Sequence, residues 1–162
     1  VVHMAVFGVV AATPEQVWSL LTEYGSLPAY MPGIDSSLVV ARSDTSCVVR
    51  QVVTTRIMLP LTFRMDLEFV PDLGSQRLRF RQVRGSLRGY EGHWEIAPGG
   101  TGSTFLRYEA RAGLRRPIPG FVAAHIVRGQ MERMSAALVG ELARRARTTG
   151  STDCAVGERG YR

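Results

Sequence analysis

Residues 61–82 read LTFRMDLEFVPDLGSQRLRFRQ and carry the clearest structural pattern in the chain. Apolar side chains alternate with Thr, Arg, Asp and Glu as far as Phe69, and a second alternation begins at Arg77. A period of two is typical of strands that bury one face, and the Pro-Asp-Leu-Gly segment at 71–74 is typical of a turn. This stretch therefore predicts an antiparallel hairpin whose apolar face belongs to the core.

Further strands and turns extend from this hairpin in both directions. Between residues 35 and 111, turn-forming residues recur about every dozen positions, which indicates a meander of antiparallel strands. Residues 1–11 are almost continuously apolar and predict a first strand that is buried on both faces. After it, the capping box formed by Thr13 and Gln16 predicts a short helix, and a second short helical turn is expected within 26–33.

The chain changes period after the last predicted strand. Residues 121–147 place apolar side chains on one stripe at helical spacing, with i,i+4 charge pairs such as Arg128 and Glu132 on the other side. A large curved sheet must cover its apolar face, and a helix of about 25 residues is long enough to do so. Because one helix cannot fill the whole concave face, the remaining space is the predicted ligand site.

The length of 162 residues suits one domain with a sizeable core. We assign residues 1–147 to this domain and expect 148–162 to be a disordered tail. No apolar run approaches the ~18 residues needed to span a membrane, and no secretory signal is evident. Cys47 and Cys154 lie in contexts too different for a disulfide, which favours a reducing, cytoplasmic compartment.

Several short motifs resemble those of the START-like (SRPBCC) superfamily and occur in the same order along the chain. They are Ala-Thr-Pro-Glu-Gln-Val-Trp at 12–18, the proline-rich stretch 27–34, Gly-Tyr-Glu-Gly-His-Trp-Glu at 89–95 and the Pro-x-Pro at 117–119. The resemblance covers residues 2–147, and the nearest subgroup is the polyketide cyclase/dehydrase and coenzyme-Q-binding one. It implies an α+β helix-grip fold. In this fold a curved antiparallel sheet of about seven strands wraps around a long C-terminal helix, with two short helices after strand 1.

Relatives in this superfamily carry lipids, chaperone quinones, close polyketide rings or bind ribosomes, so the fold leaves the function open. Our leading hypothesis is a carrier or chaperone that holds a quinone, polyketide or lipid between the sheet and the C-terminal helix. One alternative is a polyketide aromatase/cyclase or dehydrase that uses the same cavity. A second alternative is a ribosome-association or RNA-interacting module. No cofactor is expected, and the oligomeric state stays open.

The predicted ligand-binding residues share an expected inward position on the sheet, the second helical turn or the C-terminal helix. Tyrosines offer an apolar ring with one polar tip, and methionines offer an adaptable apolar wall. The same features also suit plain core packing. The residues are Tyr30, Met31, Phe63, Met65, Phe80, Tyr90, Trp94, Tyr108, Phe121, Val122, His125 and Met131.

Three residues are candidates for catalysis, although the sequence contains no assembled catalytic set. His125 falls on the apolar stripe of the C-terminal helix and is expected to face the sheet, as a ligand contact, an acid/base or a hydrogen-bonded core histidine. Arg88 shares strand parity with Tyr90 and is either an inward group that polarises a carbonyl or a solvated strand end. Tyr108 supplies an inward hydroxyl. No His-Glu-x-x-His or paired Cys motif occurs, so no metal site is predicted.

The net charge of +6 does not by itself indicate a nucleic-acid partner. Every basic residue is Arg and the chain lacks both Lys and Asn, a bias that a GC-rich genome would produce unaided. Arg77, Arg79 and Arg81 line one outward strand face, where Asp66 and Glu68 of the adjoining strand are expected to pair with them. If RNA or a ribosome is bound, this face is the predicted interface.

Overall fold

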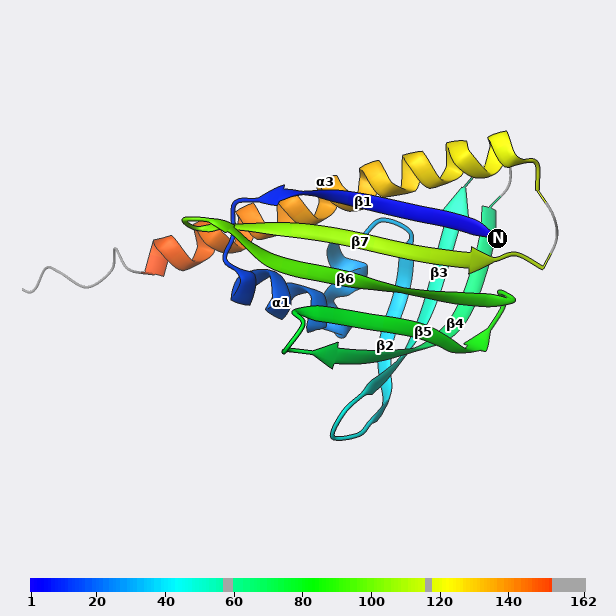
Figure 1. Ribbon diagram of the computed structural model, residues 1–162, viewed down its shortest axis with the longest axis horizontal. Coiled ribbons are helices and arrows are strands. Elements are labelled where there is room, and N and C mark those ends of the chain that lie inside the picture. Colours follow the sequence, from blue (N-terminus) through cyan, green and yellow to red (C-terminus); the bar gives the residue numbers. More distant parts are fainter. Residues whose placement is uncertain (57–59, 116–117, 153–162) are drawn as a thin grey trace, which may run out of the picture.

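The computed structural model describes residues 1–56, 60–115 and 118–152, and it contains one seven-stranded antiparallel sheet crossed by a long helix (Figure 1). The strands are β1 (Val2–Val10), β2 (Ile34–Arg42), β3 (Cys47–Arg56), β4 (Pro60–Asp72), β5 (Arg77–Gly85), β6 (Gly89–Gly100) and β7 (Ser103–Gly113). The helices are α1 (Pro14–Thr22), the 3₁₀ turn η1 (Tyr24–Ser26), α2 (Leu27–Tyr30) and α3 (Gly120–Thr152). The predicted architecture of a sheet around a long C-terminal helix is confirmed.

The strands follow the order β1-β7-β6-β5-β4-β3-β2, so every neighbouring pair except β1 and β7 is consecutive in the chain. The predicted 61–82 hairpin is the β4–β5 pair, in which Glu68 lies opposite Arg81 and Asp72 opposite Arg77. Antiparallel pairing places the starts of β4 and β6 and the ends of β3, β5 and β7 at the same end of the sheet. We call this the open end and the opposite one the closed end.

The predicted capping box is present at the start of α1. The Gln16 amide donates to Thr13 Oγ1 at 3.3 Å, and the Thr13 amide donates to Gln16 Oε1 at 2.9 Å. These two bonds satisfy backbone donors that the first helical turn leaves free. The helix they start buries Leu20 and Leu21 against the sheet.

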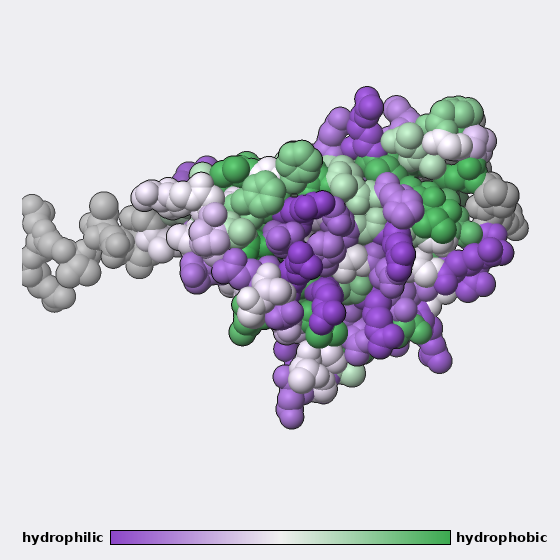
Figure 2. All heavy atoms as spheres, in the orientation of Figure 1, coloured by the Kyte–Doolittle hydropathy of each residue, from purple (hydrophilic) through white to green (hydrophobic). Residues whose placement is uncertain are grey.

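The expectation that β1 is buried on both faces is wrong. β1 is an edge strand that pairs with β7 alone, and Phe7 and Val9 on its outer face are 74% and 65% exposed. Its inward-facing Met4 and Val6 are half-buried beneath α3. Figure 2 shows hydrophobic side chains exposed along this side of the molecule. An apolar run alone does not distinguish a central strand from an edge strand whose outer face is also apolar.

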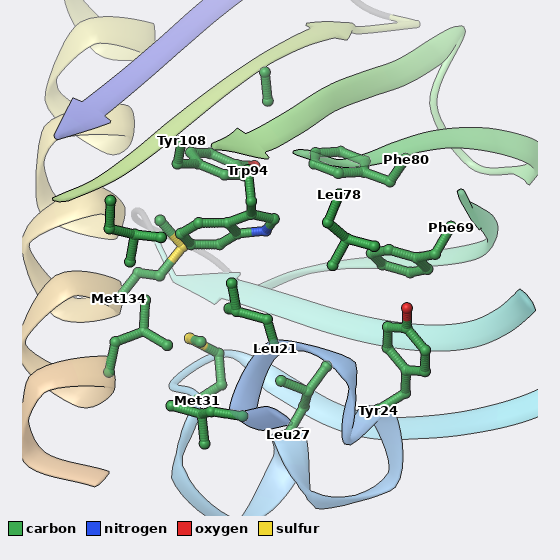
Figure 3. Packing of buried hydrophobic residues seen from close by; sticks show 14 of the residues in the cluster. Leu21, Tyr24, Leu27, Met31, Phe69, Leu78, Phe80, Trp94, Tyr108 and Met134 are labelled. Carbon is green, nitrogen blue, oxygen red and sulfur yellow. The ribbon is translucent and has the colours of Figure 1, made fainter. Parts of the chain in front are cut away.

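The closed end holds a dense apolar core (Figure 3). Side chains of α1, η1 and α2 meet the inner face of the sheet there, and Leu20 and Leu78 are completely buried. Thr104 is also completely buried, and its hydroxyl donates to the Ala12 carbonyl oxygen at 2.6 Å. A buried hydroxyl is tolerated because it has this partner. The thiol of Cys47 is buried in this core and free, whereas Cys154 lies outside the described residues.

The two halves of α3 are packed differently. In its second half Met134, Leu138 and Leu142 are buried, and the Arg145 guanidinium donates to both carboxylate oxygens of Glu23 at 3.0 and 2.7 Å. The residues before Met131 are half-buried or exposed. The second half of α3 is therefore anchored to the closed end, and the first half lies loosely over the open end.

α3 also continues to Thr152, five residues past the predicted end of this helix at Arg147. The remaining tail, 153–162, lies outside the described residues, so its disorder stays a prediction. Within the described part of the chain, no helix is both long enough and apolar enough to cross a membrane.

Candidate functional site

The inner face of the sheet becomes more exposed toward the open end. On β3, Val49 and Gln51 are buried, whereas Val53 is half-buried. On β4, Met65 is buried and Phe63 is half-buried. The same change along two neighbouring strands indicates that the compartment between sheet and helix is filled at the closed end and open at the other.

A groove of about 820 Å³ runs between β1 and the first half of α3. Val6 and Phe7 line it from β1, and Ala124, Val127 and Met131 line it from α3. Val6, Val127 and Met131 also belong to the core or pack directly against it. The groove is therefore continuous with the apolar interior of the protein.

A row of aromatic rings crosses the inner face of the sheet from β4 through β5 to β6 and β7 (Figure 3). Phe69 lies 5.8 Å from Phe80 between ring centroids, and Phe80 lies 5.2 Å from Tyr90 and 5.9 Å from Tyr108. The Tyr108 ring also contacts Trp94, with the centroids 4.6 Å apart. Spacings of this size are favourable for aromatic pairs, so these side chains form a preorganised apolar wall.

Two tyrosine hydroxyls lie in this apolar wall and are hydrogen-bonded to each other. The Tyr90 and Tyr108 hydroxyl oxygens are 2.6 Å apart. Burial raises the pKa of both phenols, so both are protonated at neutral pH. One bond between two hydroxyls uses one of their two protons. Within the described residues no other acceptor takes the second proton, so the pair keeps one unused donor.

Two further buried polar atoms face the same compartment without a partner among the described residues. They are Gln82 Oε1 on β5 and Thr55 Oγ1 on β3. The β5–β6 pairing ends at Arg81 opposite Glu91, so Gln82 follows and Tyr90 precedes the last paired residues of these two strands. Buried polar atoms almost always have a hydrogen-bond partner, and an exception often marks a binding site. We call Gln82, Tyr90 and Tyr108 the inner polar cluster.

By the exposure of their side chains, the predicted ligand-binding residues divide into buried, half-buried and exposed ones. Met31, Met65, Phe80, Trp94, Tyr108 and Met131 are buried in the core, and Phe63, Tyr90 and Val122 are half-buried toward the open end. Tyr30 is half-buried at the closed end, where its hydroxyl donates to the Leu20 carbonyl at 3.4 Å and burial raises its pKa to about 12. Phe121 and His125 are exposed. Of the whole set, Met131 lines the β1–α3 groove.

The expectation that His125 faces the sheet is wrong. His125 lies six residues before Met131, which at about 100° per residue is about 120° around the helix from that buried side chain. Phe121, at 79% exposed, also faces away from the core. Arg88 is exposed in the β5–β6 connection rather than on the inner face. Of the three catalytic candidates, only Tyr108 is therefore inside the compartment.

Sequence reasoning gave no role to Gln82 and Thr55. Both occupy inward positions in strands whose inward face is mostly apolar, although β3 also carries the buried Gln51 there. A polar residue at an inward position was the available signal, but strand parity alone does not show whether its polar atoms find partners.

The family model described as polyketide cyclase / dehydrase and lipid transport matches residues 2–147. The chain belongs to this family. Among curated proteins, no sequence matches the chain significantly.

Solved structures of similar fold support the assignment to this polyketide cyclase/dehydrase and lipid transport family. A protein of Thermus thermophilus is 25% identical, with a TM-score of 0.73 over 91% of this chain and 98% of that one. A START superfamily protein of Mycobacterium smegmatis is 18% identical, with a TM-score of 0.77 over 89% and 99%. The Zhui aromatase/cyclase of Streptomyces sp. R1128 is 18% identical, with a TM-score of 0.78 over 91% and 97%. At 18% identity these likenesses show the fold alone.

The outer face of this family member carries paired charges. Arg81 donates to Glu68 at 2.7 Å, as expected, and Arg77 lies 3.7 Å from Glu95 of β6. Asp66 pairs with Arg50 of β3 instead of with the β5 arginines. The Arg50 guanidinium donates to both carboxylate oxygens, at 2.8 and 3.0 Å, and lowers the pKa of Asp66.

A second groove, of about 970 Å³, lies on this outer face and is lined by three arginines, three glutamates and two histidines among other residues. Its charge is therefore close to balanced, which does not favour the phosphate backbone of a nucleic acid. Within the described residues, no three His, Cys, Asp or Glu side chains gather as metal ligands.

Proposed function

We propose that this protein binds a hydrophobic small molecule between the sheet and α3 and acts as its carrier or chaperone. The observation that carries the proposal is the groove between β1 and the first half of α3. Its volume of about 820 Å³ lies within the range of about 300–1,000 Å³ that is usual for small-molecule sites. The loose packing of this half of α3 supports entry of a ligand without disruption of the anchored closed end.

The inner polar cluster supports a ligand that carries at least one oxygen. A hydroxyl proton on the tyrosine pair suits a carbonyl oxygen, and Gln82 Oε1 suits a hydroxyl donor. A quinone or a polyketide has such groups along an otherwise apolar body, and so does the head of many lipids. The names of similar structures, which include an aromatase/cyclase and a STAR-related lipid transfer protein, support a cyclase substrate or a lipid but do not mention a quinone.

The test is ligand identification by native mass spectrometry, followed by binding of two probes, ubiquinone-1 and the carbonyl-free dye N-phenyl-1-naphthylamine. Replacing Ala124 by tryptophan fills the groove and is expected to weaken both probes about tenfold, or 1.4 kcal/mol. Ala136→Trp is the matched control, since Ala136 is exposed on the same helix but does not line the groove. Failure of the purified protein to bind either probe or any extracted lipophilic species would count against the proposal.

One observation favours the enzyme alternative, namely the tyrosine pair with a hydroxyl proton left for a substrate carbonyl. A protonated phenol in an apolar site can polarise a carbonyl in a cyclase or dehydrase reaction. The exposed positions of His125 and Arg88 weigh against this alternative, because they leave the pair without an inward base or cation from the predicted set. We therefore rank the carrier function first.

Replacing Tyr108 by phenylalanine is expected to weaken ubiquinone-1 binding about fivefold, because one net hydrogen bond contributes about 1 kcal/mol. Binding of N-phenyl-1-naphthylamine should be unchanged, because this dye has no carbonyl oxygen that could accept a hydrogen bond from the tyrosine pair. Tyr24→Phe is the control: Tyr24 is buried at the closed end, and its hydroxyl makes no hydrogen bond within the described residues. Fluorescence titration measures both probes. Equal losses for both would show that the variant disturbs packing rather than recognition.

A further inference from the structure

Three large apolar side chains are exposed at the open end. Leu61 at the start of β4 is 44% exposed, Ile118 just before α3 is 36% exposed and Phe121 in its first turn is 79% exposed. Single exposed apolar residues are common on soluble proteins, but three that converge on one end of the fold indicate a contact surface. Figure 2 shows hydrophobic side chains gathered at this end, where α3 begins.

Gln130 connects α3 to the start of β2, and the residues of α3 before it lie beside the start of β1. The Gln130 side-chain amide donates to the Pro32 carbonyl oxygen at 3.3 Å, and the Thr54 amide donates to the neighbouring Gly33 carbonyl at 2.8 Å. These bonds tie α3 to β3 ten residues after α3 begins at Gly120. At 1.5 Å per residue, the first part of the helix therefore extends roughly 15 Å further toward the open end.

Four arginines lie toward the same end of the sheet. Arg64 and Arg115 are both hydrogen-bonded to Ser86 in the β5–β6 connection. The backbone amide of Arg64 donates to Ser86 Oγ at 3.0 Å, and the Arg115 side chain donates through Nε to the Ser86 carbonyl oxygen at 2.8 Å. Arg84 and Arg88 flank the same connection in the chain, and Arg64 lies in β4 beside the end of β5, where Met65 pairs with Gly85. We call Arg64, Arg84, Arg88 and Arg115 the arginine rim.

The arginine rim is not neutralised by neighbouring carboxylates. Within residues 1–56, 60–115 and 118–152, none of its four guanidinium groups forms an ion pair. Asp66 lies opposite Arg84 and interacts electrostatically with it, but both of its carboxylate oxygens are hydrogen-bonded to Arg50. Elsewhere on the sheet, ion pairs such as Arg81–Glu68 and Arg111–Glu91 remove the excess charge. Positive charge is therefore concentrated toward the same end of the sheet as the exposed apolar side chains.

We propose that the open end docks on the surface of an anionic lipid bilayer. Phe121, Ile118 and Leu61 insert among the acyl chains near the headgroups, and the arginine rim contacts lipid phosphates. An apolar tip with cations toward the same end fits this partner better than RNA, because a phosphate backbone gains nothing from an exposed phenylalanine or leucine. The proposal rests on the surface of the open end and is independent of which molecule the compartment binds. Docking would place the β1–α3 groove beside the acyl region of the membrane.

The test is cosedimentation with vesicles of pure phosphatidylcholine and of phosphatidylcholine with 30% phosphatidylglycerol, at low and high salt. We expect binding to the anionic vesicles at low salt only. The Arg84→Ala/Arg88→Ala double variant should weaken it about 25-fold, about fivefold for each arginine, and Phe121→Ser should weaken it independently. The control is Arg42→Ala/Arg79→Ala, which removes two exposed arginines away from the open end and should change binding less than about twofold.

Two outcomes would overturn the proposal. Equal binding to neutral and anionic vesicles, or equal losses in the control and the rim variants, would show that the arginine rim does not recognise lipid phosphate. Salt-dependent binding of single-stranded RNA that is lost in the rim variant, without vesicle binding by the unaltered protein, would assign this end to nucleic acid instead. Urea unfolding of each variant separates loss of docking from loss of fold. Probe uptake by the unaltered protein is measured separately and tests the ligand proposal alone.

Discussion

Replacing Gly92 by alanine is expected to destabilise the protein by about 3 kcal/mol, the upper part of the usual range for overpacking. Gly92 lies at an inward position on β6, between β5 and β7. An added Cβ would lie 2.8 Å from the Cα of Ala110 and 2.8 Å from Cζ of Phe80, and still closer to the Glu109 carbonyl oxygen. Two of these three atoms belong to the backbone of a paired strand, so they cannot move aside without breaking the β6–β7 pairing.

Gly140→Ala is the matched control and is expected to change stability in the opposite direction. Gly140 lies within α3, and an added Cβ there meets nothing within 4 Å. Alanine is favoured over glycine in a helix by about 1 kcal/mol, so this variant should be more stable than the natural sequence. Urea unfolding followed by circular dichroism measures both changes. A stability for Gly92→Ala within the error of the natural protein would mean that β6 and β7 are less closely paired than the structure shows.

The local elements of the fold were predictable because short-range rules determine them. The alternation over 61–82 specified which faces of β4 and β5 are buried, and the Thr13–Gln16 capping box specified where α1 begins. The change from a strand period to a helical period after residue 113 specified that a helix covers the sheet. Each of these signals depends on residues within a few positions of one another, so a single sequence contains them in full.

The site was predicted less well because it depends on contacts between distant segments. His125 was assigned to the apolar stripe of the helix, yet it lies about 120° around the helix from the buried Met131, and only the second half of α3 is pressed against the core. Phe7 and Val9 are apolar as in a buried strand, yet β1 has a neighbour on one side only. The missing partners of Gln82 and Thr55 are likewise visible only when the surrounding strands are in place. Helical and strand periodicity predict the direction in which a side chain points, but not which residues of other segments it contacts.

Replacing Leu138 by alanine is expected to cost about 3 kcal/mol, whereas replacing Ile126 by alanine should cost about 1 kcal/mol or less. Leu138 lies in the anchored half of α3 and is 4% exposed, so its removal leaves a cavity against the closed end. Ile126 is half-buried in the loose half, where a smaller side chain leaves space that is open to solvent rather than an enclosed void. Both substitutions remove a branched aliphatic side chain from the same helix, so the difference between them reports how each half is packed.

Native-state hydrogen exchange extends this comparison to the backbone of the unaltered protein. Amides between Val122 and Arg128 should exchange much faster than those between Met134 and Leu142. Local opening of the first segment exposes little buried apolar surface, so its free-energy cost is low. A bound ligand should slow exchange in the first segment much more than in the second, because the first borders the groove and the open end, whereas the second reaches the groove only at Ser135. Uniform protection along α3, together with equal costs for Leu138→Ala and Ile126→Ala, would show a compartment closed along its whole length. A ligand would then need another route into the protein.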